Sequence, residues 1–216
     1  MPSTQPIERP EEAHAVATQY LRYERPVSAL VAVLVVSLFL GVFLATSLLP
    51  ALAVGALLVI VARAPLVQSN GTIRLRTDDT PESVLEAFTG PTPPVLAFKW
   101  GVADEITREA DAVSYRVPYL FGVRSVRVTV RTQTETTADG THHVELNVSV
   151  NDQPWSTYTA TISPTDDQTS IHVEYTSERK FGLRRLPQNF VAQRYRDEAL
   201  SAQGYTVIER DARVGI

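Results

Sequence analysis

Residues 144–175, VELNVSVNDQPWSTYTATISPTDDQTSIHVEY, decide the fold of this chain. Apolar and polar side chains alternate along three runs: Val144–Val150, Tyr158–Ile162 and Ile171–Tyr175. A period of two is typical of a strand with one buried face and one exposed face. Turn-forming residues separate the runs at Asn151–Pro154 and Pro164–Gln168. The stretch therefore predicts three strands of an antiparallel meander.

The meander extends upstream of this stretch. Val113–Val117 and Val126–Arg131 show the same alternation, and the Asp139-Gly140 pair predicts a hairpin turn before Val144. Thr72–Thr77 predicts an earlier strand, and Tyr205–Arg210 predicts a last strand at an edge. We expect an antiparallel sheet of about six to seven strands.

Helical segments flank this sheet. Thr80, Pro81 and Glu82 supply a capping hydroxyl, a first-turn proline and a first-turn acid, so a helix is expected there that ends at Gly90. Val95–Trp100 predicts a second, shorter helical piece, and a long helix is expected from Pro187 to Gly204. The fold class is therefore α+β.

The order of these elements from Gly71 to Gln203 resembles the helix-grip arrangement of the START-like (SRPBCC, polyketide cyclase-like) superfamily. The resemblance implies a curved antiparallel sheet wrapped on the long C-terminal helix, with an apolar cavity between them. It rests on element order and on no signature motif. The strand expected after Gly204 departs from the family pattern, and no residue set matches a family catalytic site.

A long uncharged segment precedes the sheet. Val27–Ala62 contains no charged side chain, and a helix needs about 20 apolar residues to cross a bilayer. Ser47 and Pro50 suit the start of a second helix, so residues 27–45 and 48–64 are expected to form a transmembrane helical hairpin. A helix over Glu11–Tyr23 is expected to stop before Pro26.

These elements divide the chain into three parts. Residues 1–19 are expected to be a disordered or short helical tail, residues 20–66 the hairpin, and residues 67–216 a soluble START-like domain. Ala51 and Ala53 resemble a signal-peptide cleavage site, but the apolar stretch before them exceeds the roughly 7–15 residues of a signal peptide.

Basic flanks predict the orientation of the hairpin. Arg22 and Arg25 precede it and Arg63 follows it, and such residues stay on the cytoplasmic side. We expect a two-pass protein of the cell membrane with both termini in the cytoplasm and the lipid bilayer as a partner. A single crossing would instead place the C-terminal part outside.

Composition excludes several classes of chemistry. The chain has no cysteine, which excludes disulfides, thiol catalysis and cysteine-ligated metals. The net charge of −4 argues against a nucleic-acid partner. No phosphate-binding loop, serine elbow or dinucleotide fingerprint occurs, so no cofactor is expected.

Aromatic side chains are the candidates for lining an apolar ligand pocket. The set is Trp100, Tyr115, Tyr119, Phe121, Tyr158, Tyr175 and Phe190. Aromatics on the dry face of a sheet also form ordinary cores, so both interpretations stay open.

A basic cluster, Arg179, Lys180, Arg184 and Arg185, is the candidate for contact with a membrane surface. An ordinary solvated loop is the alternative.

Polar clusters offer little chemistry. His143 and Glu145 share one strand face, and His172 lies on a later strand, but that face is the exposed one, so no metal site is expected. Asp78-Asp79 and Asp166-Asp167 fit helix capping and turns better than acid–base catalysis, so no catalytic residue is assigned and enzymatic activity is not expected.

Two hypotheses of function follow. The first is a membrane-anchored START-like binding module that holds a lipid, isoprenoid or other apolar molecule. The second is a structural or assembly subunit that docks a partner membrane protein without a ligand.

Overall fold

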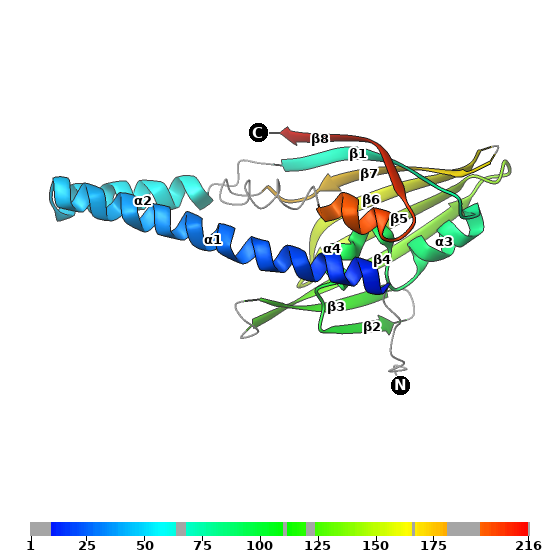
Figure 1. Cartoon of the computed structure of the whole chain (residues 1–216), viewed down its shortest axis with the longest axis horizontal. Helices are drawn as coiled ribbons and strands as arrows, with labels where there is room; N and C mark the ends of the chain where they lie inside the picture. The colour runs from blue at the N-terminus through cyan, green and yellow to red at the C-terminus, as the bar shows by residue number, and fades with distance from the viewer. Residues whose placement is uncertain are drawn as a thin grey trace.

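The computed structural model describes residues 10–63, 68–109, 112–119, 124–165, 167–180 and 195–215 of the chain. These residues form an α+β fold in which one antiparallel sheet is covered by helices, and a pair of long helices extends away from it (Figure 1). The expected fold class is confirmed in this respect.

The described sheet has eight strands, in the order β2-β3-β4-β5-β6-β7-β1-β8. Neighbouring strands are antiparallel throughout. Their bounds are β1 Gln68–Thr77, β2 Glu105–Glu109, β3 Ala112–Tyr119, β4 Arg124–Thr136, β5 His142–Val150, β6 Gln153–Pro164, β7 Thr169–Ser177 and β8 Thr206–Gly215. The meander continues from β2 to β7, and β1 then closes against β7.

One face of the sheet forms the core. Val144 and Leu146 of β5, Ile171 and Val173 of β7 and Leu75 of β1 are all buried. Each belongs to an alternating run, so the period of two in the sequence correctly assigns the inner face.

Short helices cover this inner face. α3 (Pro81–Thr89) is followed by the 3-10 turn η1 (Pro94–Leu96) and by α4 (Ala97–Trp100). Residues 195–201 are also helical, with Ala199 and Leu200 buried. Arg210 of β8 forms an ion pair with Asp197 and so ties this helix to the sheet. The expected start of the helix at Pro187 lies outside the described residues.

Two helices form a hairpin ahead of the sheet. α1 (Glu11–Ala45) and α2 (Leu48–Arg63) pack side by side, and the break between them falls at Thr46 and Ser47 (Figure 1). α1 runs through Pro26, so the expected stop before this proline is wrong. Its first turns pack on the sheet domain, where Ala13 and Ala17 are fully buried.

The expectation of a two-pass membrane protein is wrong. Among the described residues, no helix combines the length and the apolar character that crossing a bilayer requires. α2 has 16 residues, about 24 Å of helix, against a hydrocarbon core of about 30 Å. α1 begins with Glu11 and Glu12 in its first turn. This finding overturns the assignment to the cell membrane, with both termini in the cytoplasm.

Two strands differ from the expectation. β2 was not predicted, because a single apolar residue, Ile106, stands among charged and polar neighbours in Glu105–Glu109. β8 continues past Arg210 to Gly215 and pairs with β1. The described sheet is therefore larger than the six to seven strands that the pattern predicts.

Candidate ligand pocket

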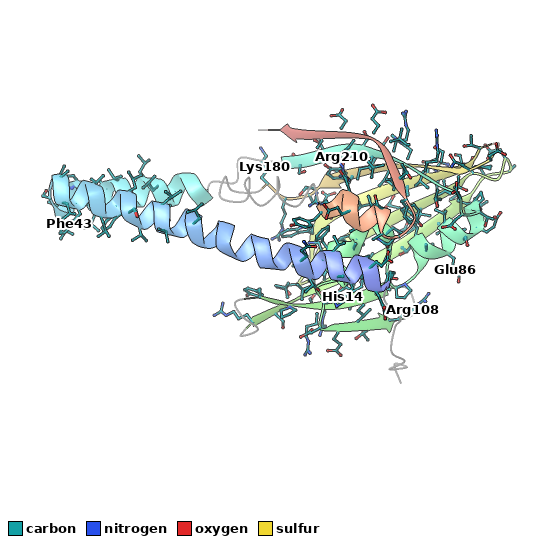
Figure 2. The ribbon with its side chains drawn as sticks, viewed as in Figure 1. His14, Phe43, Glu86, Arg108, Lys180 and Arg210 are labelled. Atoms are coloured by element: carbon teal, nitrogen blue, oxygen red, sulfur yellow. The ribbon has the colours of Figure 1, made fainter. Side chains whose placement is uncertain are left out.

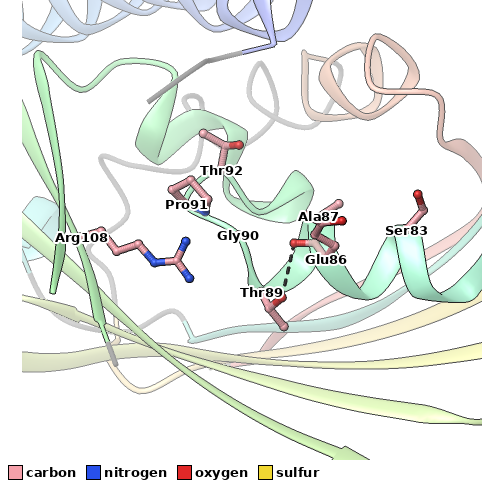
Figure 3. A pocket seen from close by; sticks show the side chains of 8 residues that line it. All are labelled: Ser83, Glu86, Ala87, Thr89, Gly90, Pro91, Thr92 and Arg108. Atoms are coloured by element: carbon pink, nitrogen blue, oxygen red, sulfur yellow. Dashed lines mark hydrogen bonds between the residues drawn. The ribbon is translucent and has the colours of Figure 1, made fainter. Parts of the chain in front are cut away.

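A hollow of about 420 Å³ opens between the end of α3 and strand β2 (Figure 3). This volume falls within the roughly 300–1,000 Å³ of small-molecule sites. The lining consists of Ser83, Glu86, Ala87, Thr89, Gly90, Pro91, Thr92 and Arg108. The pocket therefore combines two opposite charges with hydroxyl groups.

The capping of α3 fixes the helical wall of the pocket. Thr80 Oγ1 accepts a hydrogen bond of 3.3 Å from the Ser83 amide, and Pro81 takes the first helical position. Val84 and Phe88 are buried against the sheet. Ser83, Glu86, Ala87 and Gly90 follow helical spacing on another face, which turns them toward the pocket.

Two aromatic side chains hold the loop that forms the second wall. Tyr115 donates from its hydroxyl to the Pro91 carbonyl at 2.9 Å, and Trp100 donates from Nε1 to the Pro93 carbonyl at 2.9 Å. Both side chains are fully buried, and burial raises the pKa of the Tyr115 hydroxyl. A neutral phenol keeps its proton for the bond to Pro91, so these residues position the pocket wall from the core.

Two charged side chains line the hollow from separate elements. Arg108 extends from β2 toward loop 90–92 and the end of α3, and Glu86 comes from α3 itself (Figure 3). Within the described part of the chain, the side chains of Arg108 and Glu86 form no hydrogen bond or ion pair. Thr89 donates to the carbonyls of Leu85 and Glu86, so its hydroxyl is already engaged. The free hydrogen-bonding capacity among the described lining side chains therefore lies with Arg108 and Glu86 and with the hydroxyls of Ser83 and Thr92.

The aromatic candidates from the sequence do not line this pocket. Trp100 and Tyr115 belong to the core, while Tyr158 and Tyr175 are half-buried and stack on each other with ring centroids 6.0 Å apart. Tyr119 is 42% exposed. Phe121 and Phe190 lie outside the described residues. Trp100, Tyr115, Tyr158 and Tyr175 thus belong to or pack against one hydrophobic core, and their contact with a ligand stays a prediction.

The basic candidates lie at the end of β7. Arg179 and Lys180 are exposed, and Arg179 donates to Gln153 at 3.4 Å. Arg184 and Arg185 lie outside the described residues. Contact of this cluster with any surface stays a prediction.

The sheet separates His142 from His143 and His172, which lie on the outer face on either side of Thr161. His142 is buried on the inner face, with its Nδ1 2.9 Å from the Thr136 hydroxyl, while His143 lies 3.3 Å from the Thr161 hydroxyl. His172 contacts Glu174 at 3.5 Å. No three metal-binding side chains come together among the residues that the structure describes.

Arg108 and Glu86 were missed in the sequence. Arg108 lies in a strand that the periodicity does not reveal, and Glu86 has the appearance of a solvated helix position. A spacing of 22 residues carries no local signal for a shared pocket. Only the crossing of α3 toward β2 brings the two charges together.

Comparison with known proteins does not assign the chain to a family. No protein-family model matches it, and no curated protein matches it. Similar solved structures include a conserved protein from Geobacillus kaustophilus, 14% identical, with a TM-score of 0.45, covering 62% of this chain and 91% of that one. A START superfamily protein from Mycobacterium smegmatis is 11% identical, with a TM-score of 0.40, covering 63% of this chain and 97% of that one. At these values the likeness assigns no ligand, reaction or partner.

The inner face of α3 yields a prediction for alkaline pH. Tyr205 packs edge-on against Phe88, with ring centroids 6.3 Å apart, and burial together with the charge of Asp79 raises the pKa of Tyr205 to about 12. The unfolded tyrosine ionises near pH 10.0, so the folded state holds its proton longer. The stabilisation from protonated Tyr205 is therefore complete below pH 10. The free energy of unfolding should fall as pH rises from 10 toward 12, by up to about 1.4 kcal/mol per pH unit.

Urea unfolding at a series of pH values from 9 to 12 measures this fall. The variant Tyr205→Phe should show a shallower decrease, and Tyr115 accounts for part of what remains, because its pKa is raised in the same direction. An equal decrease in Tyr205→Phe and wild type would contradict the assignment to Tyr205.

Proposed function

We propose that the α+β domain is a binding module for a small ligand that carries a carboxylate and a hydrogen-bond donor. The observation that supports this proposal is the hollow of about 420 Å³ with Arg108 and Glu86 in its lining. The planar guanidinium of arginine binds carboxylates with two parallel hydrogen bonds. A carboxylate such as Glu86 accepts from an ammonium or a hydroxyl. Amino acids and hydroxy acids carry both groups.

The remaining lining suits such a ligand. Thr92 offers a hydroxyl, and Ala87, Gly90 and Pro91 offer small apolar contacts. Small pockets with a few well-placed polar groups bind by orientation more than by area. No nucleophile, base and acid converge among the described lining residues, so the proposal is binding without a reaction.

An apolar ligand such as a lipid or isoprenoid is the occupant that the resemblance to START-like proteins implies. Trp100 and Tyr115, the most deeply buried candidates for lining its cavity, instead bond to loop carbonyls inside a packed core. These two aromatic side chains do not line the described pocket. Its lining carries charged and hydroxyl groups, so it favours a polar ligand over an apolar one. An isoprenoid alcohol belongs in the test as the competing probe.

Saturation-transfer NMR of the full chain with a panel of amino acids, hydroxy acids and farnesol tests the proposal. We expect signal from at least one carboxylate-bearing compound and about tenfold or more weaker binding in Arg108→Gln, because a hydrogen bond to a charged group contributes about 1.5–3 kcal/mol. Glu86→Gln should weaken the binding of amino acids more than the binding of hydroxy acids. Arg131→Gln, an exposed arginine on β4, is the matched control.

Two results would contradict this function. Transfer from farnesol alone would favour an apolar ligand, and equal binding by Arg108→Gln and Arg131→Gln would place the ligand elsewhere.

A further inference from the structure

The hairpin of α1 and α2 carries an exposed apolar surface that the pocket does not explain. Its large apolar side chains run from Leu30 to Leu44 and from Leu48 to Ile60, and the exposed ones range from 36% at Val35 to 83% at Leu44. Exposed apolar patches of this extent are rare on single proteins and mark interaction surfaces. We call this part, residues 30–60, the apolar hairpin.

Packing within one chain covers only the inner side of the apolar hairpin. Ala51 is fully buried, and Gly55 makes room for the ring of Phe39, whose Cδ2 would lie 3.1 Å from a Cβ at that position. Gly41, in contrast, has no atom within 4 Å of such a Cβ. The outer sides of both helices therefore lack a partner within the described chain.

The uncovered surface is large enough for a specific interface. α2 has 16 residues, about 24 Å of helix, and two adjacent helices span about 20 Å, so one face covers about 500 Å² per copy. Two such faces bury about 1,000 Å², which a specific protein interface requires.

Charge indicates which partner suits this surface. Val27–Ala62 has no charged side chain, so a charged partner would lose hydration without gaining a pair. The same surface on a second copy is equally uncharged. Ser37, Gly41 and Ala45 follow each other at four-residue spacing and are exposed, which gives two helices a flat strip for close approach.

We propose that the apolar hairpin is the contact surface between two copies of this chain, which pair hairpin to hairpin as a four-helix bundle. A two-fold pair uses the same patch on both subunits, and antiparallel helices with short loops are the ordinary components of such bundles. Phe43 lies at the far end of the hairpin from Glu86 and Arg108, so the domains stay clear of the contact (Figure 2).

Cysteine cross-linking tests the contact directly, because the chain has no cysteine of its own. In Gly41→Cys, the new side chain enters open space in one copy and should meet its equivalent across the two-fold axis. We expect a covalent dimer of the full chain under mild oxidation. Ile208→Cys, at a 49%-exposed position on β8 away from the apolar hairpin, is the matched control and should form no covalent dimer.

Sedimentation velocity of the full chain measures the same contact without a cross-link. The double variant Leu34→Glu, Leu44→Glu should weaken the dimer at least about 100-fold, because two unpaired charges would be buried. Ile208→Glu makes the same chemical change at a 49%-exposed position on β8 and should leave the dimer intact. Ligand binding in the pocket should be unchanged in both variants, so failure of the dimer proposal is distinguishable from failure of the proposed binding function.

Several outcomes would overturn the proposal. A monomeric wild-type chain, an assembly larger than two copies, or no cross-link in Gly41→Cys would each do so. A different set of results would assign the surface to lipid instead. Wild type would float with phosphatidylglycerol vesicles, the double variant would not, and Gly41→Cys would form no covalent dimer.

Discussion

Replacing Trp100 with alanine should lower the free energy of unfolding by about 3–5 kcal/mol, the usual loss for removing a large aromatic side chain from a core. Trp100 is fully buried, and its Nε1 donates to the Pro93 carbonyl at 2.9 Å. The variant would leave both a cavity and an unpaired carbonyl. Urea unfolding followed by circular dichroism measures the loss, and the pocket wall at Pro91–Thr92 should loosen with it.

Two further variants separate the causes. Trp100→Phe keeps most of the apolar contact but removes the donor, so it should cost about 1–3 kcal/mol. Trp155→Ala removes a half-buried tryptophan that lies 5.6 Å from Lys99 Nζ, and its cost should be smaller than that of Trp100→Ala. A loss below 1 kcal/mol in Trp100→Ala would contradict the packing described for this residue.

The strands were predictable because each inward position repeats a simple physical need. In β5, His142, Val144, Leu146 and Val148 are buried while the residues between them are partly exposed. Because only one face of the strand is buried, apolar and polar residues alternate along it, and this alternation is visible in the sequence. The same logic predicted α3, since its start carries a hydroxyl cap and a proline.

The N-terminal helices were harder to predict, because apolar composition alone does not identify what surrounds a helix. Val27–Ala62 has the composition expected of two bilayer crossings, yet no described helix meets the requirements for one. α1 also continues through Pro26, where local preference favours a stop. Proline removes one backbone hydrogen bond, and a long helix held by packing at Ala13 and Ala17 tolerates that loss.

The pocket was not predictable, because its charges come from separate elements. Glu86 lies on α3 and Arg108 on the edge strand β2. Neither position has a periodic or motif signal, and their approach depends on how α3 crosses the sheet. The aromatic residues had a strong signal, but that signal was burial: Trp100 and Tyr115 position the pocket wall instead of lining it.

Replacing Gly71 with alanine should separate β8 from β1. A Cβ at Gly71 would lie 2.2 Å from the Asp211 carbonyl oxygen, 2.9 Å from the Tyr175 hydroxyl and 3.0 Å from Ala212 Cα. The tyrosine can move, but the carbonyl oxygen belongs to the backbone of β8 and cannot turn away without breaking the pairing of Gly71 with Ala212. We expect a loss of about 1–3 kcal/mol in the free energy of unfolding, the usual cost of overpacking.

Hydrogen exchange shows where the Gly71→Ala loss arises. Amides of Thr206–Gly215 should lose protection well before those of β5 and β6, because β8 pairs with β1 alone and can leave the sheet edge without disturbing the meander. Thr72→Ala, the next position on the same strand, removes atoms instead of adding them and should leave β8 protected. A stable Gly71→Ala variant with full protection of β8 would mean that β8 does not approach β1 this closely. The tie between Arg210 and Asp197 gives a second readout: when β8 leaves, the helix at residues 195–201 should lose protection with it.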